Sequence, residues 1–294
     1  MKSITPSADA LARAQVLVEA LPYIRRFHGQ VVVVKLGGVA MQSEPARDAV
    51  LQDLVLLRFV GMRPVLVHGG GREITAMAKA LGLETQFVDG LRVTDERTME
   101  VAKMVLTGKI TPDLVGAIHR LGGRAMGLSG EDGPTLLVRR RTGAQGQDLG
   151  LVGEIQEVNP EPLLALTEKG LIPVLASVGL GYDGLAYNVN ADTVAGAVAR
   201  ELGAGKLLLL TDVPGLLDRQ GRLLSRITAR QAEELLGQGI AADGMIPKLE
   251  AACQAARAGV SVHIVDGRQP HSILLELLTE AGVGTMIDPE PADG

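Results

Sequence analysis

Two apolar runs in the sequence stop abruptly at glycines. Residues 31–38 read VVVVKLGG, and residues 65–71 read VLVHGGG. An unbroken run of β-branched and aliphatic residues bounded by glycine is typical of a strand buried on both faces, as in a parallel sheet. Glycines at the carboxyl end of a strand let backbone N–H groups approach an anion, because no Cβ intervenes. Since open parallel sheets bind ligands at this end of their strands, the two runs predict a phosphate site.

Segments with the apolar spacing of helices alternate with strand-like runs along the rest of the chain. The pattern predicts helices over residues 7–27, 46–61, 73–81, 95–107, 159–169, 191–202, 229–237, 247–258 and 270–280. This alternation predicts an α/β fold, a three-layer αβα sandwich in which helices cover both faces of an open, mainly parallel sheet. Residues 135–141 and 150–158 differ and predict a β-hairpin-like insertion, and residues 171–179 predict one buried strand.

The order of these elements suggests how the chain is divided. A helical segment, residues 1–26, precedes the first strand and has no obvious place inside the sheet. A change of pattern near residue 203 divides the remainder into an N-terminal lobe, residues 27–203, and a C-terminal lobe, residues 204–294.

The composition narrows the class of protein. The chain has 294 residues, 46% of them hydrophobic, which allows a large core and excludes a disordered chain. Its net charge of −5 disfavours a nucleic-acid surface. The single cysteine, Cys253, excludes an intramolecular disulfide framework and a cysteine-based zinc site. No apolar run approaches the roughly 18 residues of a membrane span and no secretory pattern opens the chain, so we expect a cytoplasmic protein without a membrane partner.

Two lysines stand where a positive charge is unfavourable by itself. Lys35 lies inside the first apolar run, where burying its head group is costly unless the group meets an anion. The alternative is a lysine whose long stem lets the head reach the edge of the sheet. Lys248 lies at the start of a predicted helix, although the helix dipole favours an anion there. The alternative for Lys248 is a solvated surface position.

Other polar residues stand at the ends of predicted elements. Asp192 begins a helix, either as an ordinary first-turn acid or as a carboxylate that orients lysines around a phosphoryl group. Thr211 and Asp212 end an LLLL strand, a position that suits the ribose and phosphates of a nucleotide. Arg92 follows a predicted turn and could pair bidentately with a carboxylate, or lie on the surface. His68 precedes three glycines and a helix start, which together form an anion cradle, and we interpret His68 itself as structural.

Eight short segments occur in a fixed order from residue 30 onward: VVVKLGG, VHGGG, GLRVT, GLSGEDG, LVGEI, YNVNAD, LLLLTDVPG and DGMIPK. Each is a weak signal, but in combination they resemble the amino-acid kinase family. Within it, the resemblance is to members that phosphorylate the γ-carboxylate of N-acetyl-L-glutamate with ATP, in the second step of arginine biosynthesis. The resemblance implies an amino-acid kinase-like fold in which the N-terminal lobe binds acetylglutamate and the C-terminal lobe binds ATP.

The resemblance also implies a role for each matching residue. The residues implied to act on the transferring phosphoryl group are Lys35 and Lys248, with Asp192 positioning them. The residues implied to hold acetylglutamate are Arg92 and Asn188. The backbone donors around the γ-phosphoryl group and the substrate are implied to be Gly37, Gly38, Gly70 and Gly71. The residues in the ATP-binding half are Thr211, Asp212, Gly215 and Leu216.

The implied reaction needs few further groups. A carboxylate nucleophile is already ionised at neutral pH, so no general base is required. Positioning and electrostatic stabilisation dominate such transfers. Mg²⁺ would be held mainly by the ATP phosphates, so we expect no metal site built from several protein carboxylates.

Two features are similar to those of arginine-inhibited members of the family. One is the extra N-terminal helix, which in those members links dimers into a hexameric trimer of dimers. The other is the C-terminal pattern that runs from His271 through Glu276 to Gly282 and Gly284. The resemblance therefore implies a homo-oligomer, inhibition by arginine, and an effector site that includes Glu276, Gly282 and Gly284. A P-II-type regulator is a further possible partner.

Some points stay open. Residues 109–113 read KITPD where many members have asparagine near Thr111, with an effect on substrate affinity that cannot be read from the sequence. The chain could instead be a kinase for the aminoadipate derivative of lysine biosynthesis, or for aspartate, glutamate, carbamate or UMP. A non-catalytic nucleotide or amino-acid sensor is the alternative outside the enzymes.

Overall fold

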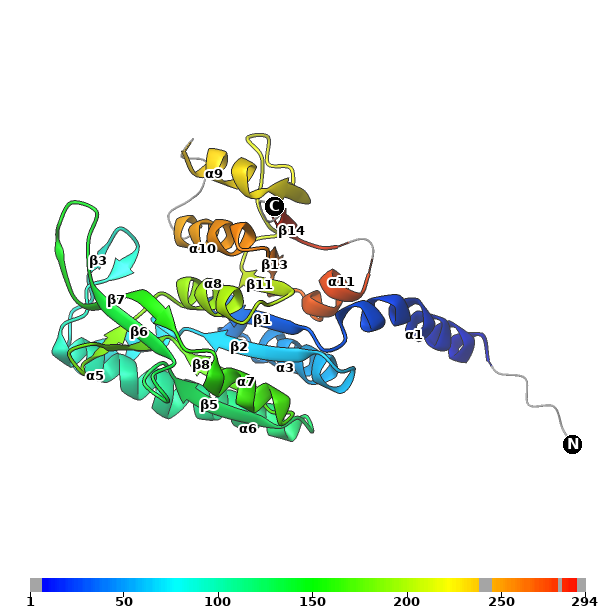
Figure 1. Ribbon diagram of the computed structural model, residues 1–294, viewed down its shortest axis with the longest axis horizontal. Coiled ribbons are helices and arrows are strands. Elements are labelled where there is room, and N and C mark those ends of the chain that lie inside the picture. Colours follow the sequence, from blue (N-terminus) through cyan, green and yellow to red (C-terminus); the bar gives the residue numbers. More distant parts are fainter. Residues whose placement is uncertain (1–6, 238–244, 280–281, 290–294) are drawn as a thin grey trace, which may run out of the picture.

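One eight-stranded sheet runs through the middle of the protein (Figure 1). The computed structural model describes residues 7–237, 245–279 and 282–289. The strand order is β12-β14-β13-β11-β1-β2-β8-β5, and every neighbouring pair is parallel except β13 and β14. The strands are β1 (Val31–Leu36), β2 (Arg63–His68), β5 (Ala125–Ser129), β8 (Ile172–Ala176), β11 (Lys206–Thr211), β12 (Arg226–Thr228), β13 (Ser261–Asp266) and β14 (Thr285–Asp288).

Alternate residues of β1 enter two separate cores, as expected for a strand that is covered on both faces. Val32 and Val34 belong to one hydrophobic cluster, whereas Val31 and Val33 belong to the other. The predicted three-layer αβα fold with a mainly parallel sheet is therefore confirmed.

Different helices cover the two faces of the sheet. The helices of the first face are α2 (Val39–Gln42), α3 (Glu44–Phe59), α4 (Gly71–Ala80), α5 (Glu96–Val105), α6 (Thr111–Arg120) and α11 (Ser272–Leu278). The helices of the second face are α7 (Glu161–Glu168), α8 (Ala191–Glu201), α9 (Ala229–Gly237) and α10 (Ile246–Arg257).

A small β layer adjoins the carboxyl edge of the main sheet. Its strands close on themselves in the order β10-β7-β6-β9, with bounds β6 (Leu136–Thr142), β7 (Asp148–Val158), β9 (Val178–Gly181) and β10 (Ala186–Asn188). A two-stranded ribbon, β3 (Phe87–Val88) with β4 (Leu91–Arg92), lies beside it. Strands β6 and β7 are antiparallel, which confirms the predicted hairpin.

Two sequence-based expectations about elements are wrong. Residues 171–179 form two strands in different sheets, because the chain leaves the main sheet at Ser177 and Gly179 allows β9 to approach Val138 of β6 closely. The helix predicted to end at residue 107 continues through a π-helical turn, η1 (Leu106–Ile110), into α6. Pro112 lies at this junction, next to the π-helical turn and at the start of α6, and the helix continues past it.

Helix α1 (Ala8–Phe27) extends away from the body of the protein and contacts it near α11 (Figure 1). Five of its apolar side chains are 48–72% exposed: Leu11, Val16, Leu17, Val18 and Leu21. Among the described helices, none has the length and apolar content needed to cross a bilayer.

The two halves of the main sheet come from different parts of the chain. Strands β11 to β14, which follow residue 203, lie on one side of β1, and the earlier strands lie on the other. The division into two lobes at residue 203 remains a prediction, because one continuous sheet joins both halves.

Candidate active site

The two glycine turns meet because their strands are neighbours in the sheet. Lys35 of β1 is in register with Val67 of β2, and Leu36 with His68. A cavity of about 200 Å³ lies at this edge. The residues expected to hold substrate or phosphate that line it are Lys35, Gly37, Gly38, Gly70, Gly71, Arg92, Asn188 and Asp192.

Three charged side chains from three elements converge beside this cavity. Lys35 comes from β1, Asp192 from the first turn of α8, and Lys248 from the first turn of α10. The Asp192 Oδ1 atom lies 3.2 Å from Lys35 Nζ and 2.6 Å from Lys248 Nζ. All three residues are less than a tenth exposed. The cluster therefore carries two buried ammonium groups on one carboxylate.

Burial and the neighbouring charges shift the pKa values of Asp192 and Lys248. Burial acts to raise the pKa of the Asp192 carboxyl, but the Lys35 and Lys248 ammonium groups outweigh it and hold that pKa below its usual value. Burial, with the charge of Lys35, lowers the pKa of Lys248 from 10.5 to about 8. The excess positive charge predicts that an anion binds here.

The lowered pKa of Lys248 predicts that activity depends on pH. The ammonium group of the free enzyme loses its proton as the pH rises through about 8, so we expect kcat/KM to fall above that pH by up to tenfold per unit. We expect kcat to persist to higher pH, because a bound phosphate favours the charged lysine. The measurement is a pH profile of both constants, with Lys248→Arg as a variant whose charge does not titrate. A wild-type kcat/KM that stays flat well above pH 8 would contradict this expectation.

The same shift has an opposite consequence for stability. Between about pH 8 and 10.5 the unfolded chain binds the lysine proton more tightly than the folded chain does. The contribution of Lys248 to the free energy of unfolding therefore increases as the pH rises through this window.

Arg92 is a buried cation without a carboxylate partner within the described residues. It is 6% exposed, and its Nη2 donates to the Gly71 carbonyl at 2.6 Å and to Thr75 Oγ1 at 2.7 Å. The guanidinium lies 4.8 Å from the centre of the Phe87 ring, and burial lowers its pKa. Because these contacts leave further N–H donors beside the cavity, Arg92 is positioned to bind an anionic ligand.

Asn188 faces the cavity from β10. Its Nδ2 donates to Thr94 Oγ1 at 3.3 Å, and Thr94 Oγ1 donates to the Arg92 carbonyl at 2.8 Å. Asn188 is thereby linked to the strand that carries Arg92. Asn190 caps α8: its side chain accepts from the N–H groups of Asp192 and Thr193, which fixes the start of the helix.

Backbone conformation and packing restrict different glycines of the two turns. Gly38 has φ +61°, in the left-handed region, and a Cβ on Gly37 would lie 2.9 Å from Lys35 Nζ. A Cβ on Gly70 would overlap the side chains of Leu106 and Ile110. Glycine is therefore favoured at Gly38 by its backbone conformation and at Gly70 by packing, whereas the neighbour of Gly37 is the end of a flexible lysine.

Of the four residues expected in the ATP-binding half, two lie at the end of a strand and two pack against Thr285. Thr211 and Asp212 lie at the carboxyl end of β11, and the Asp212 charge acts on Lys248. Gly215 has φ +153° and packs against Thr285. Leu216 is buried and its N–H already donates to Thr285 Oγ1 at 2.8 Å, so Leu216 contributes packing. The part of the DGMIPK segment before Met245, including Gly244, lies outside the described residues.

The expected effector residues lie together at a separate place, between β13 and α11. The Glu276 carboxylate accepts from the N–H groups of Val283 and Gly284 at 2.6 and 3.1 Å, and Gly282 packs against it. Glu276 Oε1 is also 2.6 Å from His263 Nδ1. His263 Nε2 in turn is 2.9 Å from Lys206 Nζ.

Sequence reasoning missed some of these neighbours. His263 and Lys206 were not singled out, although each is a polar residue in an apolar strand, which was the available signal. Ser177 and Phe87 also line the active-site cavity, and neither carries a motif that points there.

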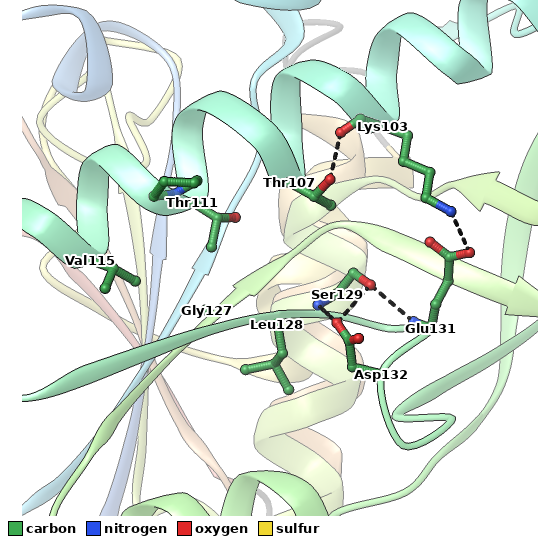
Figure 2. Close-up of a pocket in the computed structure, with 10 residues that line it drawn as sticks. Lys103, Thr107, Thr111, Val115, Gly127, Leu128, Ser129, Glu131 and Asp132 are labelled. Atoms are coloured by element: carbon green, nitrogen blue, oxygen red, sulfur yellow. Dashed lines mark hydrogen bonds and ion pairs between the residues drawn. The ribbon is translucent and has the colours of Figure 1, made fainter.

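A second cavity, of about 570 Å³, lies between α5–α6 and β5 (Figure 2). Its polar side chains engage one another: Lys103 with Glu131 at 2.8 Å, and Ser129 with Asp132 at 3.0 Å. Thr111 of the KITPD segment also lines this cavity.

Comparisons with known proteins show to which family the chain belongs. The sequence model of the amino acid kinase family matches residues 30–266. An acetylglutamate kinase from Carboxydothermus hydrogenoformans is 51% identical over 290 residues, which cover 95% of this chain and 99% of that protein.

Solved structures of a longer protein are also similar. N-acetylglutamate synthase from Neisseria gonorrhoeae, complexed with coenzyme A and N-acetyl-glutamate, has a TM-score of 0.85 and 29% identity over 95% of this chain. The same synthase complexed with coenzyme A and L-arginine has a TM-score of 0.79 and 27% identity over 94% of this chain. This chain spans 64% and 65% of those two synthase chains. The protein belongs to the amino acid kinase family, in which it shares about half of its residues with an acetylglutamate kinase over nearly its whole length.

Proposed function

We infer that this protein transfers the γ-phosphoryl group of ATP to the side-chain carboxylate of N-acetyl-L-glutamate, as a step of arginine biosynthesis. The observation that carries this inference is the pair of buried lysines on one aspartate, Lys35 and Lys248 with Asp192, beside a cavity that also contains Arg92. The similarity to acetylglutamate kinases over nearly the whole chain supports this acceptor.

The cluster suits a phosphoryl transfer without a general base. Two anions, the acceptor carboxylate and the ATP phosphates, must approach each other, and the acceptor is already ionised. Lys35 and Lys248 would offset the charge on the migrating group, while Asp192 holds both ammonium groups at one place. The glycine turns would supply backbone N–H donors to the phosphoryl oxygens.

The remaining cavity residues would hold the acceptor. The Arg92 guanidinium would bind a carboxylate of acetylglutamate, and the Asn188 amide would hydrogen-bond to its polar groups. Thr211 and Asp212 would lie towards the nucleotide. Because Asp192 is already engaged by two lysines, the Mg²⁺ that accompanies ATP would be held mainly by the phosphates.

The acceptor profile tests this function. The purified protein is offered N-acetylglutamate, the aminoadipate derivative, aspartate, glutamate, carbamate and UMP, each with MgATP, and ADP release is measured. We expect clear preference for N-acetylglutamate. Preference for another acceptor would show that N-acetylglutamate is not the substrate. Binding of ATP and an amino acid without turnover would favour a sensor.

We propose further that arginine inhibits the enzyme by binding around Glu276. The solved synthase complexed with L-arginine supports this regulation in a related structure. In this chain the Glu276 carboxylate is 4% exposed and forms the centre of a network with His263 and the 282–284 loop. A buried carboxylate is a suitable partner for a guanidinium group.

We expect Glu276→Gln to raise the arginine concentration for half-inhibition at least tenfold, with kcat unchanged, because the charge that pairs with the guanidinium is lost. The measurement is activity against arginine concentration. Glu168→Gln, an exposed position on α7, is the control. An unchanged inhibition curve for Glu276→Gln would contradict the proposed site.

We also propose that α1 joins dimers into a hexamer. The exposed apolar side chains of α1 and its contact with α11 support this role. The test compares the full chain with a chain that lacks residues 1–26. The arginine inhibition curve and the mass in solution are measured for both. Equal mass and equal arginine sensitivity in the two chains would contradict it.

A further inference from the structure

The histidine that precedes the second glycine turn is completely buried and has two polar neighbours. His68 Nδ1 lies 3.1 Å from the Gly69 carbonyl oxygen, and His68 Nε2 lies 2.8 Å from Thr111 Oγ1. Thr111 is 43 residues further along the chain, at the junction of η1 and α6. Burial lowers the pKa of His68 to about 4, so the ring is neutral at physiological pH.

The neighbours decide which ring nitrogen of His68 carries the proton. A carbonyl oxygen can only accept, so the bond to Gly69 requires the proton on Nδ1. Nε2 is then an acceptor, and the Thr111 hydroxyl must donate to it. The Leu106 carbonyl, 2.9 Å from the same hydroxyl, keeps a partner because it also accepts the backbone N–H of Thr111. The opposite tautomer would leave the Nδ1 lone pair facing the Gly69 carbonyl oxygen.

This arrangement reaches the active-site cavity through one peptide group. The Gly69 carbonyl and the Gly70 N–H belong to the same trans peptide plane and point in opposite directions, so holding the carbonyl orients the N–H. Gly69, Gly70 and Gly71 all line the cavity. The side chains of Leu106 and Ile110 in η1 pack against Gly70 from behind and leave the turn little freedom.

Thr111 is itself fixed in place. Its methyl group packs against Gly127 of β5, where a Cβ would overlap it, and Figure 2 shows the two residues on facing elements. Thr111 lines the second cavity and lies outside the lining of the active-site cavity. Its hydroxyl therefore does not face the active-site cavity, and its side-chain partner on the glycine turn is His68.

We propose that Thr111 is a positioning residue: its hydroxyl fixes the tautomer of His68, and the His68 Nδ1–H in turn orients the Gly69–Gly70 peptide in the active site. The tautomer of His68 does not depend on the proposed function; only the expected effect on kcat/KM rests on it. It gives a role to the position at which this chain differs from many members of the family.

The tautomer is measured directly by ¹⁵N NMR of the full-length protein labelled at its five histidines. A His68→Gln spectrum assigns the His68 signals. At neutral pH we expect Nδ1 to be protonated and Nε2 to be a hydrogen-bonded acceptor, and we expect Thr111→Val to change the Nε2 shift. A wild-type ring protonated on Nε2 would overturn the proposal, whatever reaction the protein performs.

Kinetics test the consequence for the reaction. We expect Thr111→Val, which keeps the shape of the side chain, to lower kcat/KM about tenfold, the size of one lost hydrogen bond. Thr111→Ser and Thr111→Asn should restore activity, because each supplies a donor to Nε2. Thr107→Val is the matched control, since the Thr107 hydroxyl donates to the Lys103 carbonyl in the same helical segment. Wild-type kinetics for Thr111→Val, or an equal loss for Thr107→Val, would overturn the proposal.

Discussion

Replacing Lys35 with methionine is expected to lower kcat about 10²- to 10³-fold with little change in folding. The Lys35 ammonium is one of the two cations proposed to stabilise the migrating phosphoryl group, and loss of one such donor has an effect of this size. Folding should persist because the remaining Lys248 and Asp192 form a neutral pair at 2.6 Å. The measurement is steady-state kinetics with N-acetylglutamate and MgATP, together with thermal unfolding.

The Lys35 variant also has an internal check. Since the charge of Lys35 lowers the pKa of Lys248, its removal should move the alkaline limb of the kcat/KM profile to higher pH. Lys109→Met, an exposed lysine in η1, is the control and should behave as wild type. Turnover within a few-fold of wild type for Lys35→Met would refute its proposed role.

Replacing Arg92 with leucine is expected to raise the KM for N-acetylglutamate about 100-fold or more, with a smaller change in the KM for ATP. Truncating one partner of a buried charged pair costs about 2–5 kcal/mol, and each 1.4 kcal/mol is a factor of ten. The KM for N-acetylglutamate of Arg92→Lys should lie between those of the wild type and Arg92→Leu, because lysine keeps the charge but lacks the planar guanidinium. The measurement is KM for each substrate, varied separately.

Two comparisons make the Arg92 result specific. Arg97→Leu, an exposed arginine in the next helix, should leave both KM values unchanged. Arg92 also holds the Gly71 carbonyl and Thr75, so the thermal midpoint of Arg92→Leu shows how much of the effect is structural. Equal rises in both KM values would argue against a role in binding the acceptor.

Sequence reasoning identified the features that depend on near neighbours in the chain. Apolar runs such as 31–36 specify strands buried on both faces, and the glycines that follow end them. A lysine inside such a run has few alternatives to an anion, which is why Lys35 could be singled out. The alternation of strands and helices then favours a mainly parallel sheet, because each helix returns the chain to the end of the sheet where the previous strand began.

Other features could not be predicted because they depend on how distant segments pack. The resemblance implied that Asp192 positions Lys35 and Lys248, but no local pattern indicates it. The contact depends on β1, α8 and α10 meeting at one edge, since Lys248 and Asp192 are 56 residues apart. Whether residues 171–179 continue as one strand depends on Gly179 meeting Val138 of β6, and not on local propensity.

The sequence alone thus determined the fold class and the two glycine turns, since these depend on local patterns of burial and backbone freedom. The resemblance to the family indicated most of the residues proposed to bind substrate. Only the tertiary structure decided how the charges are shared, which residues surround Glu276 and which side chain meets His68. These depend on strand register and helix packing, through which side chains far apart in the chain come within hydrogen-bond distance.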